Sequence, residues 1–209
     1  LEVPSAIQRH LLRQAIEELL GNLRDIEARH IEEIMAALGK PAGKKLSLPG
    51  GLIFAIEYER YLLAPEPAAL SPFPLISNEF ALTIPGETLF SGWRVKATII
   101  KPERMKGEGN NFTAYLNLDE VGDSVVVRTR QAGDKFQPLG MSQPKELAEF
   151  MIDAKIPRAW RQQVPIVSSS KHILWVVGWR IDDRVKVTEN TKQVLRLEFQ
   201  RVSDSSNEV

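Results

Sequence analysis

The sequence predicts an α+β protein in two parts: an N-terminal helix pair with a small β-ribbon, then a mixed-sheet α+β domain with one principal helix. Three observations favour this class. Apolar residues recur at helical spacing near the N-terminus, prolines cluster between residues 65 and 75, and short alternating apolar runs follow that cluster. A chain of 209 residues is long enough for one large or two small domains.

The first helix is predicted over residues 6–20, where apolar residues at spacings of three and four form one face. Ser5 is the expected N-cap, and Gly21 is expected to end the helix. A second amphipathic helix is expected to begin after Asp25, its candidate cap, and to end at Gly39. Because so few residues join the two helices, we expect them to lie against each other.

A small ribbon is predicted next, with strands at residues 45–48 and 52–58 on either side of Pro49-Gly50-Gly51. Proline fixes one backbone torsion and glycine permits positive φ, so this tripeptide favours a turn. Residues 1–64 are therefore assigned to a helical, substrate-binding-like domain. Residues 65–75 are assigned to a linker, because prolines this dense prevent helix and interior strand alike.

Residues 76–203 are assigned to the α+β domain, and the polar residues 204–209 to a frayed tail. Mostly strands with one helix among them are typical of this class. The helix is expected at about 144–154, and the strands at 79–84, 92–100, 112–118, 124–130, 164–167, 172–179, 184–188 and 194–201.

Composition excludes several classes of protein. The 27 basic residues balance 27 acidic ones, so a nucleic-acid partner has to be argued from a local patch. Without cysteine there is no disulfide, thiolate metal site or cysteine nucleophile, and the cytoplasm is the expected compartment. No apolar run approaches about 20 residues, so we expect no membrane partner. The N-terminus has neither Met nor a signal pattern, which indicates a fragment of a longer protein.

The sequence contains no self-contained active site that we can assemble. The three histidines lack metal-ligand spacing, and the glycine-rich residues 107–111 lack the lysine and Ser/Thr of a phosphate-binding loop. Asp182 and Asp183 are interpreted as a solvated hairpin turn rather than a catalytic pair. We therefore predict no catalytic residue, metal or cofactor within this chain.

Positive charge is in local excess between residues 128 and 161, a stretch that contains seven basic and four acidic residues. Arg128 and Arg130 are two apart on a predicted strand and so share a face, while Lys145 is expected to open the helix. Lysine and arginine in such an arrangement suit phosphate contacts. An alternative interpretation, surface cations answered by nearby carboxylates, stays open.

The same region carries a family resemblance. Four motifs occur in order over about 75 residues, and they resemble the C-terminal domain of bacterial tRNA(Ile)-lysidine synthetase. They are Arg128-x-Arg130, Gly133-Asp134-Lys135-Phe136-x-Pro138-x-Gly140-Met141, Phe150-x-Ile152-Asp153-Ala154-Lys155-Ile156-Pro157-Arg158 and Trp175-Val176-Val177-Gly178-Trp179-Arg180-Ile181. Upstream, the helix pair and Leu48-Pro49-Gly50-Gly51 are similar to the substrate-binding domain that precedes it in that family.

The resemblance implies a portion of an ATP-dependent ligase. The family's full enzyme joins lysine to C2 of cytidine 34 in the tRNA(Ile) anticodon, and its ATP site is an N-terminal PP-loop domain with a Ser-Gly-Gly-x-Asp-Ser signature. No residues here match that signature. The implied partners are therefore tRNA(Ile) and the catalytic domain of the same polypeptide, in a bacterial cytoplasm. The isolated chain would be inactive and would hold no cofactor, because ATP binds in the catalytic domain.

The resemblance also implies that basic residues dock the tRNA backbone, since A-form RNA is recognised largely through shape and phosphates. The expected tRNA-binding residues are Arg128, Arg130, Lys135, Lys145, Lys155, Arg158, Arg161 and Arg180. Arg158 has an alternative role, bonding the carbonyls that end the preceding helix. Trp175 and Trp179 are expected to pack in the core rather than stack on bases.

A second class of function stays open. The apolar strand predicted at residues 172–179 could offer a free edge to another chain, making this a protein-interaction module or a homodimer without RNA contact.

Overall fold

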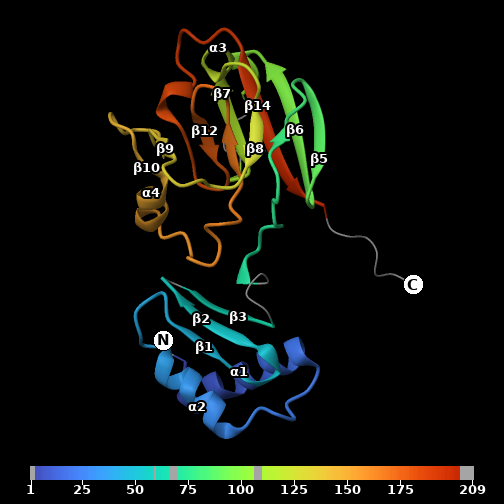
Figure 1. Cartoon of the computed structure of the whole chain (residues 1–209), viewed down its shortest axis with the longest axis vertical. Helices are drawn as coiled ribbons and strands as arrows, with labels where there is room; N and C mark the ends of the chain where they lie inside the picture. The colour runs from blue at the N-terminus through green and yellow to red at the C-terminus, as the bar shows by residue number, and fades with distance from the viewer. Residues whose placement is uncertain (1–2, 59, 66–69, 106–109, 203–209) are drawn as a thin grey trace, which may run out of the picture. The chain divides into compact units, whose positions relative to one another are not determined.

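The computed structural model describes residues 3–58, 60–65, 70–105 and 110–202 (Figure 1). The chain divides into two compact units. Unit 1 contains Leu1–Pro72 together with Pro157–Trp160, and unit 2 contains Phe73–Ile156 and Arg161–Val209. The tail expected at 204–209 lies outside the described residues.

Unit 1 begins with the two predicted helices, α1 (Ser5–Leu20) and α2 (Ala28–Ala37), which pack through buried isoleucines. Gly21 ends α1 with φ at 75°, as predicted. The two predicted N-caps are wrong. Pro4 precedes the first turn of α1, and Glu27 caps α2 in a reciprocal pair with His30.

The ribbon of unit 1 has the predicted turn and one strand more than expected. Strands β1 (Lys45–Ser47), β2 (Ile53–Glu57) and β3 (Arg60–Ala64) form an antiparallel sheet, and the short helix η1 (Pro49–Gly51) joins the first two. Strand β2 is central and is buried on both faces, so its pattern is not a simple alternation.

Residues distant in sequence complete unit 1. The carboxylate of Glu57, only 2 % exposed, accepts backbone N–H groups from Arg158 at 2.9 Å and Ala159 at 3.4 Å. The indole N–H of Trp160 donates to the Leu70 carbonyl at 2.6 Å, and the Arg60 guanidinium lies over the same indole ring. A short segment that follows the main helix of unit 2 thus belongs to unit 1.

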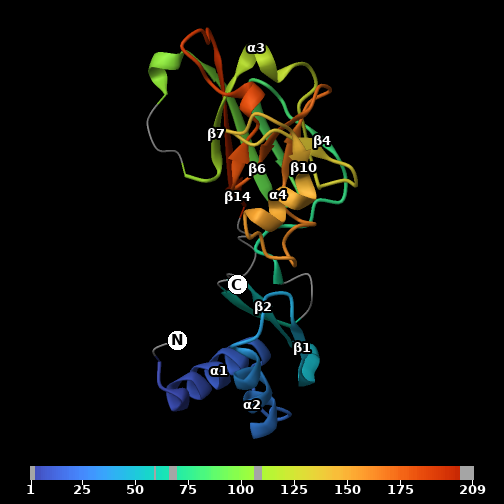
Figure 2. The same cartoon turned by 90° about the vertical axis from the view of Figure 1, so that its left-hand side faces the viewer.

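Unit 2 contains two antiparallel sheets and a two-stranded ribbon (Figures 1 and 2). The five-stranded sheet has the order β13-β12-β11-β8-β4, the four-stranded sheet β5-β6-β14-β7, and the ribbon pairs β10 with β9. The strands are β4 (Phe80–Ala81), β5 (Gly86–Phe90), β6 (Trp93–Ile100), β7 (Thr113–Asn117), β8 (Val126–Arg128), β9 (Lys135–Phe136), β10 (Lys145–Glu146), β11 (Ile166–Ser168), β12 (Ile173–Val176), β13 (Arg180–Ile181) and β14 (Val194–Arg201).

The α+β class is confirmed, but the expected mixed sheet is not formed. Every strand pair of the described residues is antiparallel. Short connections account for the pairs β1–β2, β2–β3, β5–β6, β11–β12 and β12–β13, because antiparallel neighbours need only a turn. The pairs β4–β8, β8–β11, β6–β14 and β7–β14 join strands that lie far apart in the sequence. The helices of unit 2 are α3 (Leu118–Val121) and α4 (Leu147–Asp153), with short 3₁₀ turns η3 (Pro102–Arg104) and η4 (Asp183–Val185).

Aromatic side chains join the two sheets of unit 2. Phe199 on β14 meets Trp175 on β12 edge to face, with ring centroids 5.3 Å apart, and meets Trp93 on β6 at 5.7 Å. Trp175 is 2 % exposed, so its predicted place in the core is confirmed. Trp179 differs, because it lies beyond the end of β12 and is only half-buried.

Several local predictions in unit 2 are wrong. Lys145 lies in β10 and not in α4, which is shorter than expected because the ribbon takes up its first residues. The strand expected at 184–188 is replaced by η4, and β5 was not predicted. The expected free edge at 172–179 is absent too, because β12 lies between β11 and β13.

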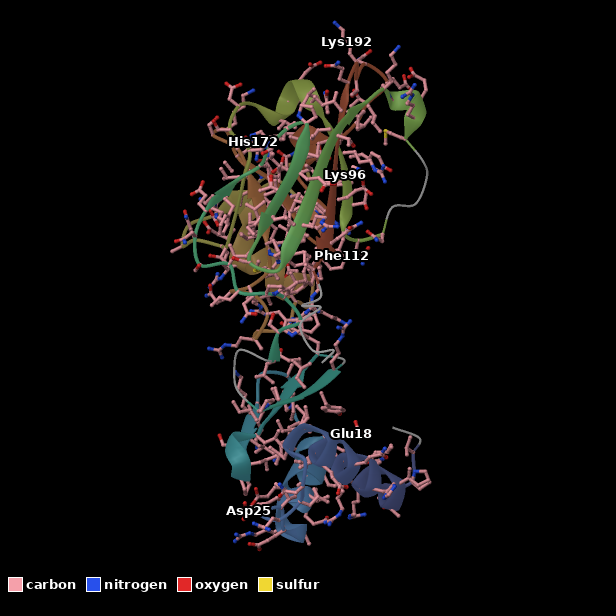
Figure 3. The ribbon with its side chains drawn as sticks, turned by 90° about the vertical axis from the view of Figure 1, so that its right-hand side faces the viewer. Glu18, Asp25, Lys96, Phe112, His172 and Lys192 are labelled. Atoms are coloured by element: carbon pink, nitrogen blue, oxygen red, sulfur yellow. The ribbon has the colours of Figure 1, made fainter. Side chains whose placement is uncertain are left out.

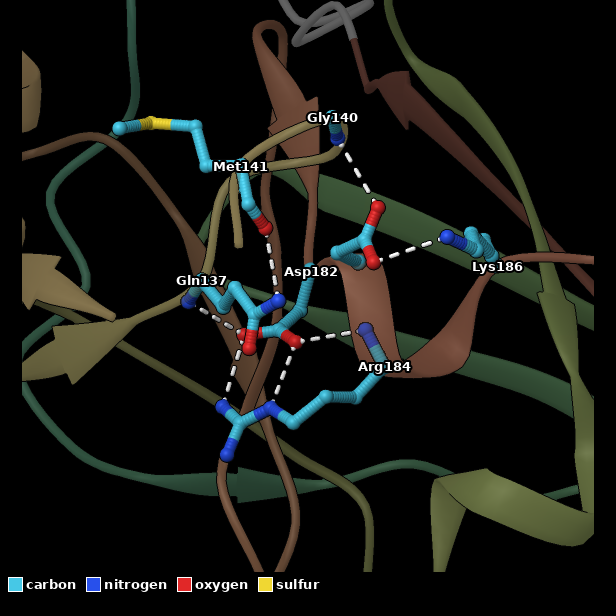
Figure 4. A network of polar contacts seen from close by, with 7 residues as sticks. Gln137, Gly140, Met141, Asp182, Arg184 and Lys186 are labelled. Atoms are coloured by element: carbon cyan, nitrogen blue, oxygen red, sulfur yellow. Dashed lines mark hydrogen bonds and ion pairs between the residues drawn. The ribbon is translucent and has the colours of Figure 1, made fainter. Parts of the chain in front are cut away.

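A buried carboxylate organises one side of unit 2 (Figure 4). Asp182, expected in a solvated turn, is fully buried and accepts the backbone N–H of Gln137 at 2.8 Å. It also accepts the backbone N–H of Arg184 and two hydrogen bonds from the Arg184 guanidinium. Next to it, Asp183 accepts the Gly140 N–H at 2.9 Å and the Lys186 ammonium group at 2.9 Å. These bonds fix residues 137–141 to η4.

Replacing Asp182 with Ala should lower the free energy of unfolding by about 3 kcal/mol, because Arg184 and the Gln137 N–H would lose their acceptor. Chemical denaturation of the two proteins measures the difference. The matched control is Asp123→Ala at an exposed bend, expected within about 0.5 kcal/mol of the parent. Equal losses in the two variants would contradict the role of Asp182.

Candidate nucleic-acid interface

Most of the basic residues predicted to contact tRNA lie around the β9–β10 ribbon and α4, which is seen beside β10 in Figure 2. Among the residues predicted to contact tRNA, we call those that lie in unit 2, except Arg128, the basic surface. They are Arg130, Lys135, Lys145, Lys155, Arg161 and Arg180. Arg158 belongs to unit 1, where its backbone bonds Glu57 and its side chain is exposed.

Arg128 has a structural partner. Its guanidinium donates to both carboxylate oxygens of Asp134 at 2.8 Å, and the side chain is only 14 % exposed. Asp134 also accepts the Gln131 N–H at 2.7 Å, so this ion pair holds the turn at residues 131–134. Arg130 lies beyond the end of β8, so the expected pair of arginines on one strand face is not formed.

Arg130, next to this turn, forms no ion pair within the described residues. Its Nε atom is buried without a hydrogen-bond partner, and no carboxylate of the described residues forms an ion pair with it. The side chain lines a hollow of about 450 Å³, which we call the Arg130 hollow. The other lining residues are Gln131, Ala132, Gly133, Asp134, Glu146, Ala148 and Gln162. An unpaired guanidinium beside amide groups suits an anion such as a phosphodiester.

Two lysines of the basic surface are paired, as the alternative interpretation predicted. Lys135 lies 3.3 Å from Glu146 across the ribbon, and Lys145 contacts Asp153 on α4. The pair of Lys135 and Glu146 is exposed, and exposed pairs contribute little to stability. Lys135 can therefore leave Glu146 and bind a phosphate at a small cost in free energy.

The arginine that bonds the backbone just beyond α4 is Arg161. Its Nε donates to the Ile156 carbonyl at 2.9 Å, three residues past the last residue of the helix, whereas the alternative role of bonding the helix-ending carbonyls was assigned to Arg158. Lys155 lies two residues after α4 with φ at 52°, in the left-handed region, and its side chain is exposed. Arg180 on β13 is exposed, and it lines a second hollow with Lys145 and Trp179.

Hydrogen bonds and burial shift the pKa of three groups in unit 2. The Gly140 N–H and then the Lys186 ammonium group lower the pKa of Asp183. The hydrogen bonds to Asp182 raise the pKa of Arg184, so this arginine stays charged. Burial, and then the nearby Arg184, lower the pKa of His172, whose Nε2 is buried without a hydrogen-bond partner (Figure 3).

Sequence reasoning did not identify the residues that hold this interface together. In unit 2, Asp134 and Asp182 accept hydrogen bonds from groups that folding brings near them, and Glu57 does the same for the Arg158 backbone within unit 1. The only signal was indirect: Asp134 lies within a recognised motif, and Asp182 directly follows another. Over the described residues, no group of three or more acidic or histidine side chains is placed to hold a metal ion. Within the same ranges, no helix has the length and apolar character to cross a membrane.

Comparison with known proteins agrees with this architecture. Residues 125–199 match the family described as the TilS substrate C-terminal domain. A crystal structure of a TilS C-terminal domain superposes with a TM-score of 0.52 and 27 % identity, covering 60 % of this chain and 98 % of that one.

Two tRNA(Ile)-lysidine synthases illustrate the similarity over more of the chain. The protein from Dehalococcoides mccartyi (strain CBDB1) is 51 % identical over 195 residues, covering 93 % of this chain and 41 % of the relative. The protein from Caldanaerobacter subterraneus subsp. tengcongensis is 32 % identical over 200 residues, with the same two coverages. The predicted resemblance to the C-terminal portion of this family is confirmed, and the chain spans about two fifths of the length of these relatives.

His172 should make stability depend on pH. Its pKa is lower in the folded than in the unfolded chain, so between those two values the unfolded chain binds more protons and stability falls as pH falls. We expect His172→Gln to lose less stability than the parent between pH 7.5 and pH 5.5 in denaturation experiments. An identical pH dependence in parent and variant would contradict this role for His172.

Proposed function

We propose that this chain is the tRNA-binding C-terminal portion of a tRNA(Ile)-lysidine synthase, and that it docks and orients tRNA(Ile). The observation that carries the proposal is the basic surface around the β9–β10 ribbon and α4, which lies within the segment that matches the TilS family. The names of the relatives support the choice of RNA.

The basic surface suits an A-form RNA backbone. Arg130 and Arg180 have no ion-pair partner in the part of the chain that the structure describes, so binding a phosphate would break no pair at either residue. The turn at 131–134 holds the position of Arg130, and the pairing of β13 with β12 holds that of Arg180, which limits the conformational entropy lost on binding. Such contacts give affinity and orientation but little base specificity.

Arg128 has a positioning role in this proposal. Its bidentate bond to Asp134 fixes the turn beside Arg130, so its removal would act on tRNA binding through the Arg130 hollow. Lys135, Lys145, Lys155, Arg158 and Arg161 remain proposed backbone contacts.

The chemical step belongs elsewhere in this account. A full enzyme of the family would join lysine to C2 of cytidine 34 with ATP, in a catalytic domain of the same polypeptide. This chain would increase the rate by holding the tRNA in a productive orientation.

We expect Arg130→Gln and Arg180→Gln each to weaken tRNA binding, by similar factors for tRNA(Ile) and for a non-cognate tRNA, because phosphate contacts carry no sequence information. A filter-binding salt series should also show the slope of log K against log salt flattened by somewhat less than about one unit per variant. Lys96→Gln, an exposed lysine on β6, is the matched control and should bind as the parent does (Figure 3).

If both variants keep parental affinity and slope while thermal melting shows an intact fold, the basic surface is not the docking site. A parent protein that binds no tRNA at low salt would exclude the proposed function itself.

The isolated chain should neither adenylate the anticodon cytidine nor attach lysine to it. Incubation with tRNA(Ile), labelled ATP and lysine, followed by nucleoside analysis, tests this. Detecting either product from this chain alone would overturn the division of roles proposed above.

A further inference from the structure

We infer that unit 2 contains a subsite for one unpaired RNA nucleotide, in the second hollow beside α4. This inference rests on the proposed function and deepens it, because it adds recognition of a single-stranded base to docking of the backbone. We call the site the Trp179 hollow. Its volume is about 300 Å³, at the lower end for ligand pockets, and it is lined by Pro138, Met141, Lys145, Phe150, Asp153, Ala154, Trp179 and Arg180.

The lining of the Trp179 hollow has the chemistry of a base-stacking site. Five of its residues, Pro138, Met141, Phe150, Ala154 and Trp179, present carbon-rich side chains. Trp179 packs against Phe73, with ring centroids 5.8 Å apart, yet it stays half-buried and lines the hollow. Trp175, by contrast, is enclosed in the core. A partly exposed indole in an apolar hollow accepts any base, because every base has a π-face.

Charge distinguishes a nucleotide from a neutral apolar ligand. Arg180 is exposed and unpaired within the described ranges, and Lys145 contacts the exposed Asp153. A phosphate beside the stacked base would therefore meet the Arg180 guanidinium directly. Bases of a duplex are stacked on their neighbours, so a hollow of this size is open only to a base from a single-stranded stretch.

The hollow is also rigid. Pro138 and Met141 line it, and the loop 137–141 that carries them is held by the bonds of Gln137 to Asp182 and of Gly140 to Asp183 (Figure 4). Within that loop the Gln137 side-chain amide donates to the Met141 carbonyl at 2.7 Å, and the Met141 N–H donates to the Pro138 carbonyl at 2.9 Å. The Met141 side chain is 43 % exposed, so it reaches solvent at the rim. A preformed wall lowers the entropy lost when a base enters.

Tryptophan fluorescence tests this subsite, with a single-stranded RNA tetranucleotide and a blunt RNA duplex of the same base composition as probes. We expect the tetranucleotide to quench the emission of the parent and the duplex to quench it far less. Trp179→Phe should lose this quenching, because the remaining three tryptophans, at positions 93, 160 and 175, are buried.

Affinity for the tetranucleotide is measured with one variant at the rim of the hollow and one control on β5. Met141→Glu places an acidic group at the hollow and should weaken binding at least about tenfold, the effect of a like charge beside the phosphate. The control Leu89→Glu places the same acidic group at another exposed apolar residue, on β5, and should bind as the parent does. Thermal melting of each variant establishes that it is folded.

Equal quenching by duplex and tetranucleotide, unchanged quenching in Trp179→Phe, or parental affinity in folded Met141→Glu would each overturn the inference. Binding of tRNA by the parent is measured in parallel. If tRNA binds and the tetranucleotide does not, the nucleotide subsite is wrong and the docking function stands. If neither binds, the proposed function fails as well.

Discussion

The candidate interface depends most on the hydrogen bonds accepted by the fully buried carboxylate of Asp182. A carboxylate removed from water is stable only when donors surround it, and here Gln137 and Arg184 supply four hydrogen bonds. Those donors come from two segments some 45 residues apart in sequence, so satisfying one charge fixes the loop 137–141 against η4. That loop in turn forms a wall of the Trp179 hollow. Folding and the geometry of the site are thus linked through one side chain.

The basic residues divide into those that hold the structure and those left for a ligand. Arg128 and Arg184 are paired with Asp134 and Asp182, and Arg161 bonds the Ile156 carbonyl just beyond α4. Arg130 and Arg180 line hollows without an ion-pair partner among the described residues. Net charge conceals this division, because the whole chain carries no net charge. What matters for RNA binding is which cations lack a carboxylate near them, and only the folded arrangement decides that.

The sequence predicted the elements whose signal is local. Helix periodicity located α1 and α2, Pro49-Gly50-Gly51 located the turn of the ribbon, and alternating apolar residues located β6, β7 and β14. It could not predict what depends on distant partners. Asp182-Asp183 resembles any polar turn until Gln137 and Gly140 are brought to it, and nothing near Glu57 in sequence indicates its bonds to Arg158 and Ala159. The sequence showed the basic cluster as a local excess of charge, but it did not show which of these residues form ion pairs and which do not.

The most direct test of the account is to map where tRNA touches the chain, by ultraviolet cross-linking of bound tRNA(Ile) followed by mass spectrometry of the cross-linked peptides. We expect cross-links within residues 128–162 and around Trp179 and Arg180, with few on the exposed side chains of β5 and β6. Cross-links concentrated on β5 and β6, and absent from the ribbon, α4 and both hollows, would contradict it.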